Sequence, residues 1–209
     1  MSKTAHIVAV EVSNVGEGYI ECDPRSTLQN LPSWIGPRQL LETLDYKQHP
    51  QRPELRQLIP YIIVTDKEGN PLVYERATSG NETRLHGKLA IGVGGHVDLE
   101  DAQVCEDGSL DVFETVAVSS LREIEEEIGI QAKPEDITWT GLIRIDDGEV
   151  DRVHLGIVGE LSLSGLKEDG IAQEIANAKF MPYDEINKLA HQGRVLEAWT
   201  AVIVEGKTS

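Results

Sequence analysis

A cluster of glutamates on one predicted helix constrains this chain more than any other feature. Apolar periodicity predicts a helix over residues 113–128, and residues 122–130 read Arg-Glu-Ile-Glu-Glu-Glu-Ile-Gly-Ile. At 100° per residue, a narrow apolar stripe faces the core and three acidic side chains stack on the opposite face. The stripe comprises Ala117, Leu121, Ile124 and Ile128, and the acidic face comprises Glu123, Glu126 and Glu127. Gly129 follows as a helix-ending residue, because glycine tolerates the left-handed conformation of a helix C-terminus.

This acidic face has two explanations that differ in chemistry. Runs of charge are usually solvated helix faces, and a solvated face is the explanation that applies to most glutamate clusters. A hard divalent cation is the alternative, because Mg²⁺ and Mn²⁺ prefer oxygen ligands and bind carboxylates together with substrate phosphates.

The residues around the cluster favour the cation. The chain contains the string G-x5-E-x7-R-E-U-x-E-E-x-G-U, where U is aliphatic, formed by Gly108, Glu114, residues 122–127 and Gly129. This string resembles the signature of the Nudix hydrolase family at every position. The glycine of the string has two candidates: Gly108, or the pair Gly94-Gly95 that follows the predicted strand 89–93. We favour the pair, which makes residues 99–112 an insertion.

The resemblance implies a fold, an activity and a set of site residues. Nudix proteins are α/β/α sandwiches around a mixed β-sheet, and they typically hydrolyse a pyrophosphate bond in a nucleoside diphosphate linked to another group. The resemblance implies Mg²⁺ or Mn²⁺, with metal ligands at Glu123, Glu126, Glu127 and the backbone carbonyl of Gly94. It assigns catalytic roles to Glu126 and Arg122, where Arg122 holds a box glutamate by a charge-assisted bond, and a supporting role to Glu114. Glu114 is alternatively a helix N-terminal acid.

Further candidates lie outside the string. Glu174 stands six residues before Phe180, where some relatives place a general base, and an ordinary loop carboxylate is the alternative. Four basic residues could bind substrate phosphates or only offset nearby acids: Arg76, Arg84, His86 and Lys88. Residues 84–97 also resemble a subgroup described as predicted phosphoesterases.

The rest of the chain predicts one α/β domain with an N-terminal elaboration. We expect the elaboration over residues 1–56, packed on the core, and the Nudix domain over residues 57–209. Apolar and alternating runs predict strands over residues 6–12, 58–65, 72–75, 88–93, 137–145, 150–163 and 179–181. The turn over residues 67–71 predicts that the strands 58–65 and 72–75 form a hairpin. The stretch after residue 12, with Pro24, Pro32 and Pro37, is expected to be mostly loop. Helical patterns cover residues 39–46, 184–191 and 196–204.

Charge and composition exclude several classes of partner. The 209 residues carry 36 acidic and 19 basic side chains, for a formal net charge of −17. This balance argues against a nucleic-acid polymer or a membrane surface as partner. No apolar run approaches the length of a membrane helix, and the two cysteines suggest no disulfide framework, so we expect a cytoplasmic setting. The resemblance is compatible with a homodimer.

Two functions from different classes follow. The first is a divalent-metal-dependent pyrophosphohydrolase acting on a small-molecule nucleotide-type substrate. The second is a non-catalytic nucleotide-binding or regulatory module on the same fold, against which the intact glutamates argue. Isomerisation of an isoprenoid diphosphate is a weaker alternative, because Cys105 is the sole cysteine near the box. The identity of the substrate does not follow from the sequence.

Overall fold

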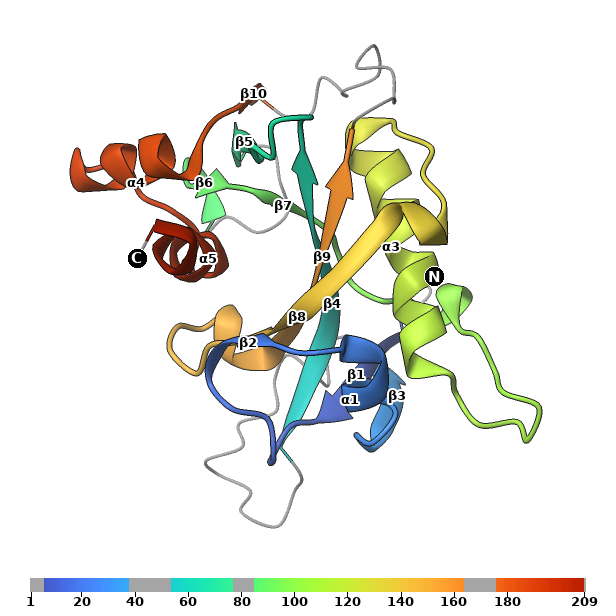
Figure 1. Cartoon of the computed structure of the whole chain (residues 1–209). Helices are drawn as coiled ribbons and strands as arrows, with labels where there is room; N and C mark the ends of the chain where they lie inside the picture. Colours follow the sequence, from blue (N-terminus) through green and yellow to red (C-terminus); the bar gives the residue numbers. More distant parts are fainter. Residues whose placement is uncertain (1–5, 38–53, 77–84, 164–175, 209) are drawn as a thin grey trace, which may run out of the picture. The chain divides into compact units, whose positions relative to one another are not determined.

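The computed structural model describes residues 6–37, 54–76, 85–163 and 176–208 (Figure 1). The chain divides into two compact units, each assembled from three stretches of sequence. The first unit comprises Met1–Pro60, Gly95–Ser120 and Trp139–Val158, and the second comprises Tyr61–Gly94, Leu121–Thr138 and Gly159–Ser209. The predicted division between residues 56 and 57 stays a prediction.

A sheet of seven strands has most of its residues in the first unit. Its strands are β1 (His6–Glu11), β2 (Gly18–Glu21), β3 (Ser33–Pro37), β4 (Leu55–Thr65), β7 (Gly92–Val93), β8 (Ile137–Arg144) and β9 (His154–Ser162). Six strands follow the order β2-β8-β9-β4-β1-β3, and β7 pairs with β4. Strand β1 runs antiparallel to both β3 and β4, and β2 runs antiparallel to β8. Strand β7 and parts of β4, β8 and β9 belong to the second unit.

The core of the first unit follows the two-residue period of its strands. In β1, Val8 and Val10 pack into the large cluster, whereas Ile7 and Ala9 join a small cluster with Leu55. Helix α3 (Val112–Ile128) contributes residues from its first half to the large cluster. These residues are Val112, Phe113 and Val116. The short elements are α1 (Pro24–Leu28), η3 (Leu99–Asp101), η4 (Pro134–Asp136) and η5 (Asp151–Val153).

Two arginines are buried in the first unit and share their acidic partners. Arg144 donates from Nη2 to Glu54 at 2.7 Å and from Nε to Asp146 at 2.8 Å. Arg56 reaches the same two carboxylates, at 2.9 and 2.8 Å. Both arginines therefore have charged partners in the low-dielectric interior, where an unpaired charge is costly.

The second unit has a sheet of its own and two helices. Its strands are β5 (Leu72–Glu75), β6 (Leu89–Ala90) and β10 (Ala176–Phe180), and its helices are α4 (Tyr183–His191) and α5 (Ala198–Thr208). The strand order is β10-β5-β6, with antiparallel pairing throughout. Helices α4 and α5 lie side by side (Figure 1). The second half of α3 and the end of β4 complete the unit.

The structure corrects three expectations about the secondary structure. The turn after β4 is present, with an isolated bridge between Thr65 and Pro71, but β5 pairs with β6 and β10 instead of with β4. The single strand predicted over residues 88–93 is divided into β6 and β7, which belong to different sheets. The stretch read mostly as loop after residue 12 contains β2, α1 and β3. The helix predicted over residues 39–46 lies outside the described residues.

Gly92 lets strand β7 approach an aromatic ring that cannot move aside. A Cβ atom at this position would lie 2.2 Å from Cζ of Tyr61. The Tyr61 hydroxyl shares a 2.9 Å hydrogen bond with Thr200, and its ring meets Trp199 edge-on at 5.4 Å. We expect Gly92→Ala to lower the free energy of unfolding by about 3 kcal/mol, the upper range for overpacking. Urea unfolding followed by circular dichroism measures this change.

The matched control for that prediction is Gly206 in helix α5. A Cβ at Gly206 meets nothing within 4 Å, and the residue is exposed. Gly206→Ala is therefore expected to stabilise the protein by up to about 1 kcal/mol, because alanine favours a helix over glycine. Equal effects of the two substitutions would contradict the steric explanation.

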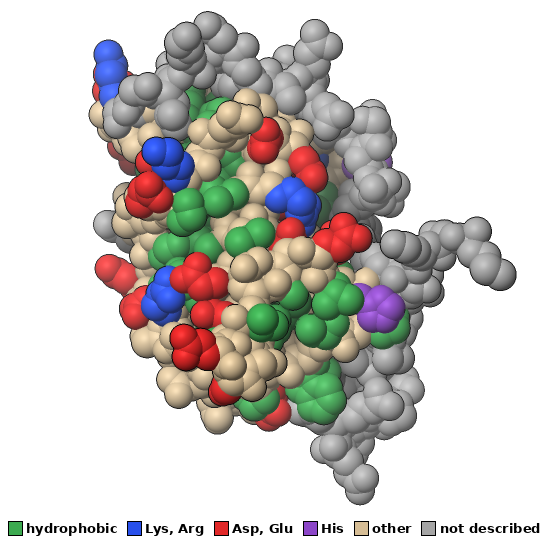
Figure 2. Space-filling model, turned by 90° about the vertical axis from the view of Figure 1, so that its right-hand side faces the viewer, with side chains coloured by type: hydrophobic (Ala, Val, Ile, Leu, Met, Phe, Trp, Pro, Cys, Tyr) green, Lys and Arg blue, Asp and Glu red, His purple; other side chains and the backbone are tan. Residues whose placement is uncertain are grey.

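The acidic character of the sequence is visible on the surface. Acidic side chains outnumber basic ones on the face drawn in Figure 2, and the basic ones lie beside acidic neighbours. Residues 98–127 alone contain 11 acids and one base, Arg122. Across the described ranges, the structure contains no helix with the length and apolar character needed to cross a membrane.

Candidate metal and phosphate site

The second half of α3 turns two of its three box glutamates inward. Ile124 and Ile128 are fully buried, which fixes the rotation of the helix about its axis. The Glu123 side chain is only 12% exposed, whereas the Glu126 side chain is 60% exposed. Glu127 is also partly buried. The backbone N–H of Gly129 donates to Glu125, and Gly129 has a φ of 71°, the conformation expected for a helix-ending glycine.

Arg122 bridges two of the box glutamates. Its Nη1 lies 2.7 Å from Oε1 of Glu123 and 3.2 Å from Oε2 of Glu126. A charge-assisted bond of this length orients a carboxylate strongly. The geometry matches the contact that the resemblance implies for Arg122, while its role in catalysis stays a prediction.

Glu127 is the carboxylate with the most perturbed environment. Burial raises the pKa of Glu127 to about 7, from an ordinary value of 4.5. Arg76 and a hydrogen bond from the Gly94 backbone lower this pKa, whereas the charges of Glu123 and Glu197 raise it. Burial therefore disfavours the charged form of Glu127, and a bound cation would favour that form.

Arg76 is the basic residue whose charge lowers the pKa of Glu127, and it has a buried partner. Its Nε donates to Oε1 of Glu197 at 2.6 Å. The Glu197 side chain is 7% exposed and that of Arg76 is 28% exposed. The guanidinium also lies over the Tyr74 ring, with Cζ 5.6 Å from the ring centroid. The sequence did not predict Glu197 as a site residue, because a single acid just before a helix is not a distinctive pattern.

The donor set suits a hard divalent cation. Within the described ranges, no three His, Cys, Asp or Glu side chains form a ready metal cluster, and the exposed Glu126 is paired with Arg122. Mg²⁺ nevertheless uses only one or two carboxylates in many sites and completes its shell with waters and substrate phosphates. Glu123 and Glu127, four residues apart on one helix face, supply such a pair. All of these residues belong to the second unit.

The two glycine candidates have different surroundings. Gly94 directly follows β7 and donates its backbone N–H to Glu127. Gly108 lies in a turn closed by a bridge between Val104 and Leu110, and has open space around it. Gly94 is thus the candidate glycine whose backbone contacts the box helix, and the insertion over residues 99–112 stays a prediction.

The remaining predicted residues are not all gathered at this site. Glu114 belongs to the first unit, where it forms an ion pair with Arg25, whose guanidinium lies over Phe113. Lys88 accepts the backbone N–H of Arg76, and His86 lies two residues before it. Arg84 and Glu174 lie outside the described residues.

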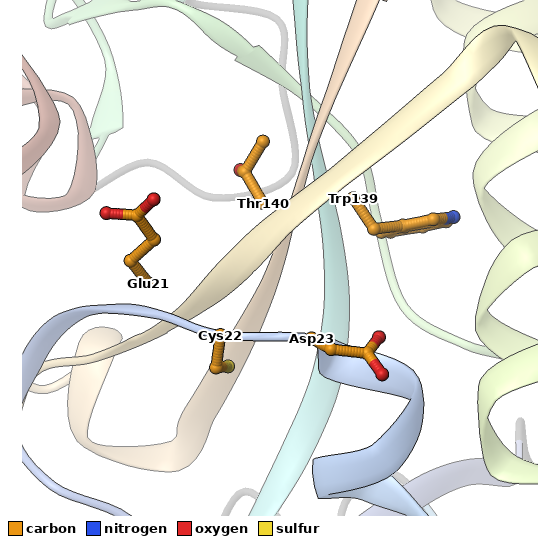
Figure 3. A pocket seen from close by; sticks show the side chains of 5 residues that line it. All are labelled: Glu21, Cys22, Asp23, Trp139 and Thr140. Atoms are coloured by element: carbon orange, nitrogen blue, oxygen red, sulfur yellow. The ribbon is translucent and has the colours of Figure 1, made fainter.

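A pocket of about 480 Å³ in the first unit contains none of the predicted site residues. Its lining residues are Glu21, Cys22, Asp23, Trp139 and Thr140 (Figure 3). Trp139 points toward α3 and meets Phe113 edge-on at 5.4 Å. Because its charged lining residues are acidic, this pocket does not suit a phosphate.

Comparison with solved structures identifies the fold. Tm1382, a candidate Nudix hydrolase, superposes with a TM-score of 0.68 and 20% identity, covering 96% of each chain. A Nudix hydrolase from Alicyclobacillus acidocaldarius superposes with a TM-score of 0.50 and 17% identity, covering 72% of this chain and 90% of that one. The chain therefore has the Nudix hydrolase fold, which confirms the predicted fold class.

Comparison with curated sequences identifies the family. Protein YmaB of Bacillus subtilis (strain 168) is 32% identical over 155 residues, which cover 73% of this chain and 71% of YmaB. This chain belongs to the same family as YmaB. No family model matches the sequence. The phosphoesterase-like subgroup stays a prediction.

Proposed function

We propose that this protein is a divalent-metal-dependent hydrolase that cleaves a pyrophosphate bond in a nucleoside diphosphate linked to another group. The observation that carries the proposal is the inward pair Glu123 and Glu127 beside Arg76, on the box helix of a Nudix fold. Two partly buried carboxylates beside a guanidinium can bind a cation and a phosphate together.

Each residue of the site has a task in this proposal. Glu123, Glu126, Glu127 and the Gly94 carbonyl would hold Mg²⁺ or Mn²⁺, which when bound neutralises phosphate oxygens and lowers the pKa of water. Arg122 keeps Glu123 and Glu126 in place through its two hydrogen bonds. Arg76 pairs with phosphate oxygens, and His86, Lys88 and Arg84 are further candidates for that contact. Glu126 is exposed enough to accept a proton from water, and Glu174 stays the other candidate base.

A substrate panel tests the proposal. Nucleoside diphosphates linked to sugars, nucleotides and alkyl groups are incubated with the protein in Mg²⁺, Mn²⁺ or EDTA, and the products are identified by mass spectrometry. We expect release of a nucleoside monophosphate from at least one conjugate with a divalent metal and none with EDTA. Equal release with and without EDTA would remove the metal from the mechanism.

A second candidate is a non-catalytic nucleotide-binding or regulatory module. The observation that favours it is the pairing of Arg122 with Glu123 and Glu126, because a guanidinium already neutralises two of the three box glutamates. Tight binding of a nucleotide in EDTA, without turnover in either metal, would support the module and contradict the hydrolase.

The site also predicts how stability depends on pH and metal. Because the folded-state pKa of Glu127 exceeds its ordinary value, the folded protein retains a proton that the unfolded chain has lost between pH 4.5 and about 7. Without metal, the free energy of unfolding therefore falls as pH rises through this window, by at most about 3 kcal/mol. Mn²⁺ binds the deprotonated carboxylate and should stabilise the protein more near pH 8 than near pH 5.

Urea unfolding with Mn²⁺ or EDTA at both pH values measures this coupling. In Glu127→Gln the titrating group is gone, so we expect a weaker dependence on both pH and metal. Coincident unfolding curves with and without Mn²⁺ near pH 8 would count against a metal site at Glu127.

A further inference from the structure

The Nε and Nη atoms of the Arg76 guanidinium have different surroundings. Its Nε is bound to Glu197 at 2.6 Å. With the residues that the structure describes, neither Nη atom of Arg76 makes a hydrogen bond, and 28% of the side chain is exposed. A guanidinium with its two outer nitrogens available is a planar fork that matches two oxygens of a phosphate.

The carboxylate that holds this fork is itself fixed by the backbone. The N–H of Glu197 donates to the Leu89 carbonyl at 2.9 Å, beside a parallel bridge between Leu89 and Leu196. The Glu197 carbonyl accepts from Ala201 in the first turn of α5. Glu197 is therefore tied to strand β6 on one side and to α5 on the other.

Arg76 is anchored through its own backbone to the residues that directly precede strand β6. Its N–H donates to the Lys88 carbonyl, and its carbonyl accepts from Gly87, both at 3.0 Å. Strand β6 and the two residues that precede it thus set the positions of both members of the ion pair. Such a doubly anchored pair loses little side-chain freedom when it forms, unlike a pair on the surface.

A fixed guanidinium matters because other carboxylates compete for it. Glu127 interacts electrostatically with Arg76, and Glu123 lies one helical turn before Glu127. If the Nη atoms of Arg76 bound a box glutamate, they would neutralise a proposed metal ligand and would no longer be available to the substrate phosphate. Glu197 occupies the Nε edge and so keeps the guanidinium in one orientation.

We propose that Glu197 is a positioning residue that holds Arg76 as a fork for the phosphate oxygens of the substrate. The inference rests on the proposed function and adds to it a residue that does not touch substrate. Its consequence is a defect in substrate binding, visible in KM, with the chemical step largely preserved.

The test compares Glu197→Ala with its conservative variant. We expect Glu197→Ala to raise KM about tenfold or more and to change kcat less than about threefold, as the loss of one charge-assisted bond predicts. Glu197→Gln keeps an oxygen that accepts the Nε proton, so its KM should stay within about threefold of wild type. Arg76→Ala should raise KM at least as much, and adding Glu197→Ala to it should have no further effect.

A matched control is available in the same unit. Glu75 pairs with Arg194 on the surface at 2.9 Å, so Glu75→Ala breaks an ion pair without touching Arg76. Its KM should equal that of wild type. An unchanged KM in a folded Glu197→Ala, or additive effects in the double variant, would overturn the positioning role.

Two further measurements test the inference if Glu197→Ala does not fold or if no conjugate is hydrolysed. If Glu197→Ala does not fold, nitrogen-15 NMR of wild type decides: ADP should shift the Arg76 Nη–H signals and leave its Nε–H signal in place, and the reverse pattern overturns the inference. If no conjugate is hydrolysed, the Kd of ADP replaces KM with the same expected ratios. A wild type that is active while Glu197→Ala has normal KM rejects only the positioning role and leaves the hydrolase intact.

Discussion

Glu127→Gln is expected to lower kcat on the best conjugate by on the order of 10³ at saturating Mn²⁺. The amide keeps the size of the side chain but removes the charge that a cation needs. Glu127 is the box residue with the strongest reason to bind one, because it is partly buried and interacts with the charges of Glu123 and Glu197 as well as with Arg76. Steady-state kinetics with a metal titration measure the loss.

The matched control for this substitution is on the same helix. Glu125 is exposed and accepts a hydrogen bond from Gln131 at 3.0 Å, away from the inward pair. Glu125→Gln removes the same charge from the same acidic segment and should leave kcat within about twofold of wild type. Equal losses in the two variants would show that overall charge, and not a specific ligand, governs activity.

Arg144→Met is the substitution with the largest expected effect on stability. Arg144 donates to the backbone carbonyls of Val12 and Val15 at 3.0 and 2.6 Å, in addition to its bonds with Glu54 and Asp146. Its side chain is only 9% exposed. Methionine fills similar space but leaves two carbonyls and two carboxylates short of a donor. We expect the free energy of unfolding to fall by about 3–5 kcal/mol.

Urea unfolding of Arg144→Met beside Arg194→Met checks this estimate. Arg194 forms one ion pair, with Glu75, and its side chain is 47% exposed. The surface substitution should change stability by about 0.5 kcal/mol or less. Similar values for both variants would mean that the buried network around Arg144 contributes no more than an exposed pair.

The box helix was predictable because its signal is local. Apolar spacing placed residues 113–128 on a helix, and the structure has α3 over Val112–Ile128. Helical periodicity also placed Glu123, Glu126 and Glu127 on one side. It did not predict that Glu123 is 12% exposed while Glu126 is 60% exposed, because that difference depends on what packs against each side chain.

The partners of the helix were harder to predict because they come from distant parts of the chain. Glu197 reaches Arg76 only because residues 195–197 join strand β6, and no spacing rule links residues 121 positions apart. The pairing of β5 was misread for a related reason. A tight turn after β4 looks like a hairpin in sequence, but hydrogen bonds with β6 and β10 decide which sheet β5 enters.

The acidic residues are concentrated in one segment of the chain, and only some of them belong to the candidate site. Residues 98–127 contain 11 acids, and the inward glutamates are among them. Others of these acids, such as Glu125 and Glu126, are exposed to water, where repulsion is weak. The proposed cation site therefore involves the three box glutamates, of which Glu123 and Glu127 point inward, and not the acidic segment as a whole.

The central claim is tested most directly by the masses of the products that wild type forms in ¹⁸O-labelled water with Mn²⁺. Hydrolysis between the two phosphorus atoms of a nucleoside diphosphate conjugate predicts two phosphate monoesters, one of which carries a single ¹⁸O atom. A panel in which no conjugate yields such a pair, or in which every product keeps an intact pyrophosphate bond, would contradict the assignment.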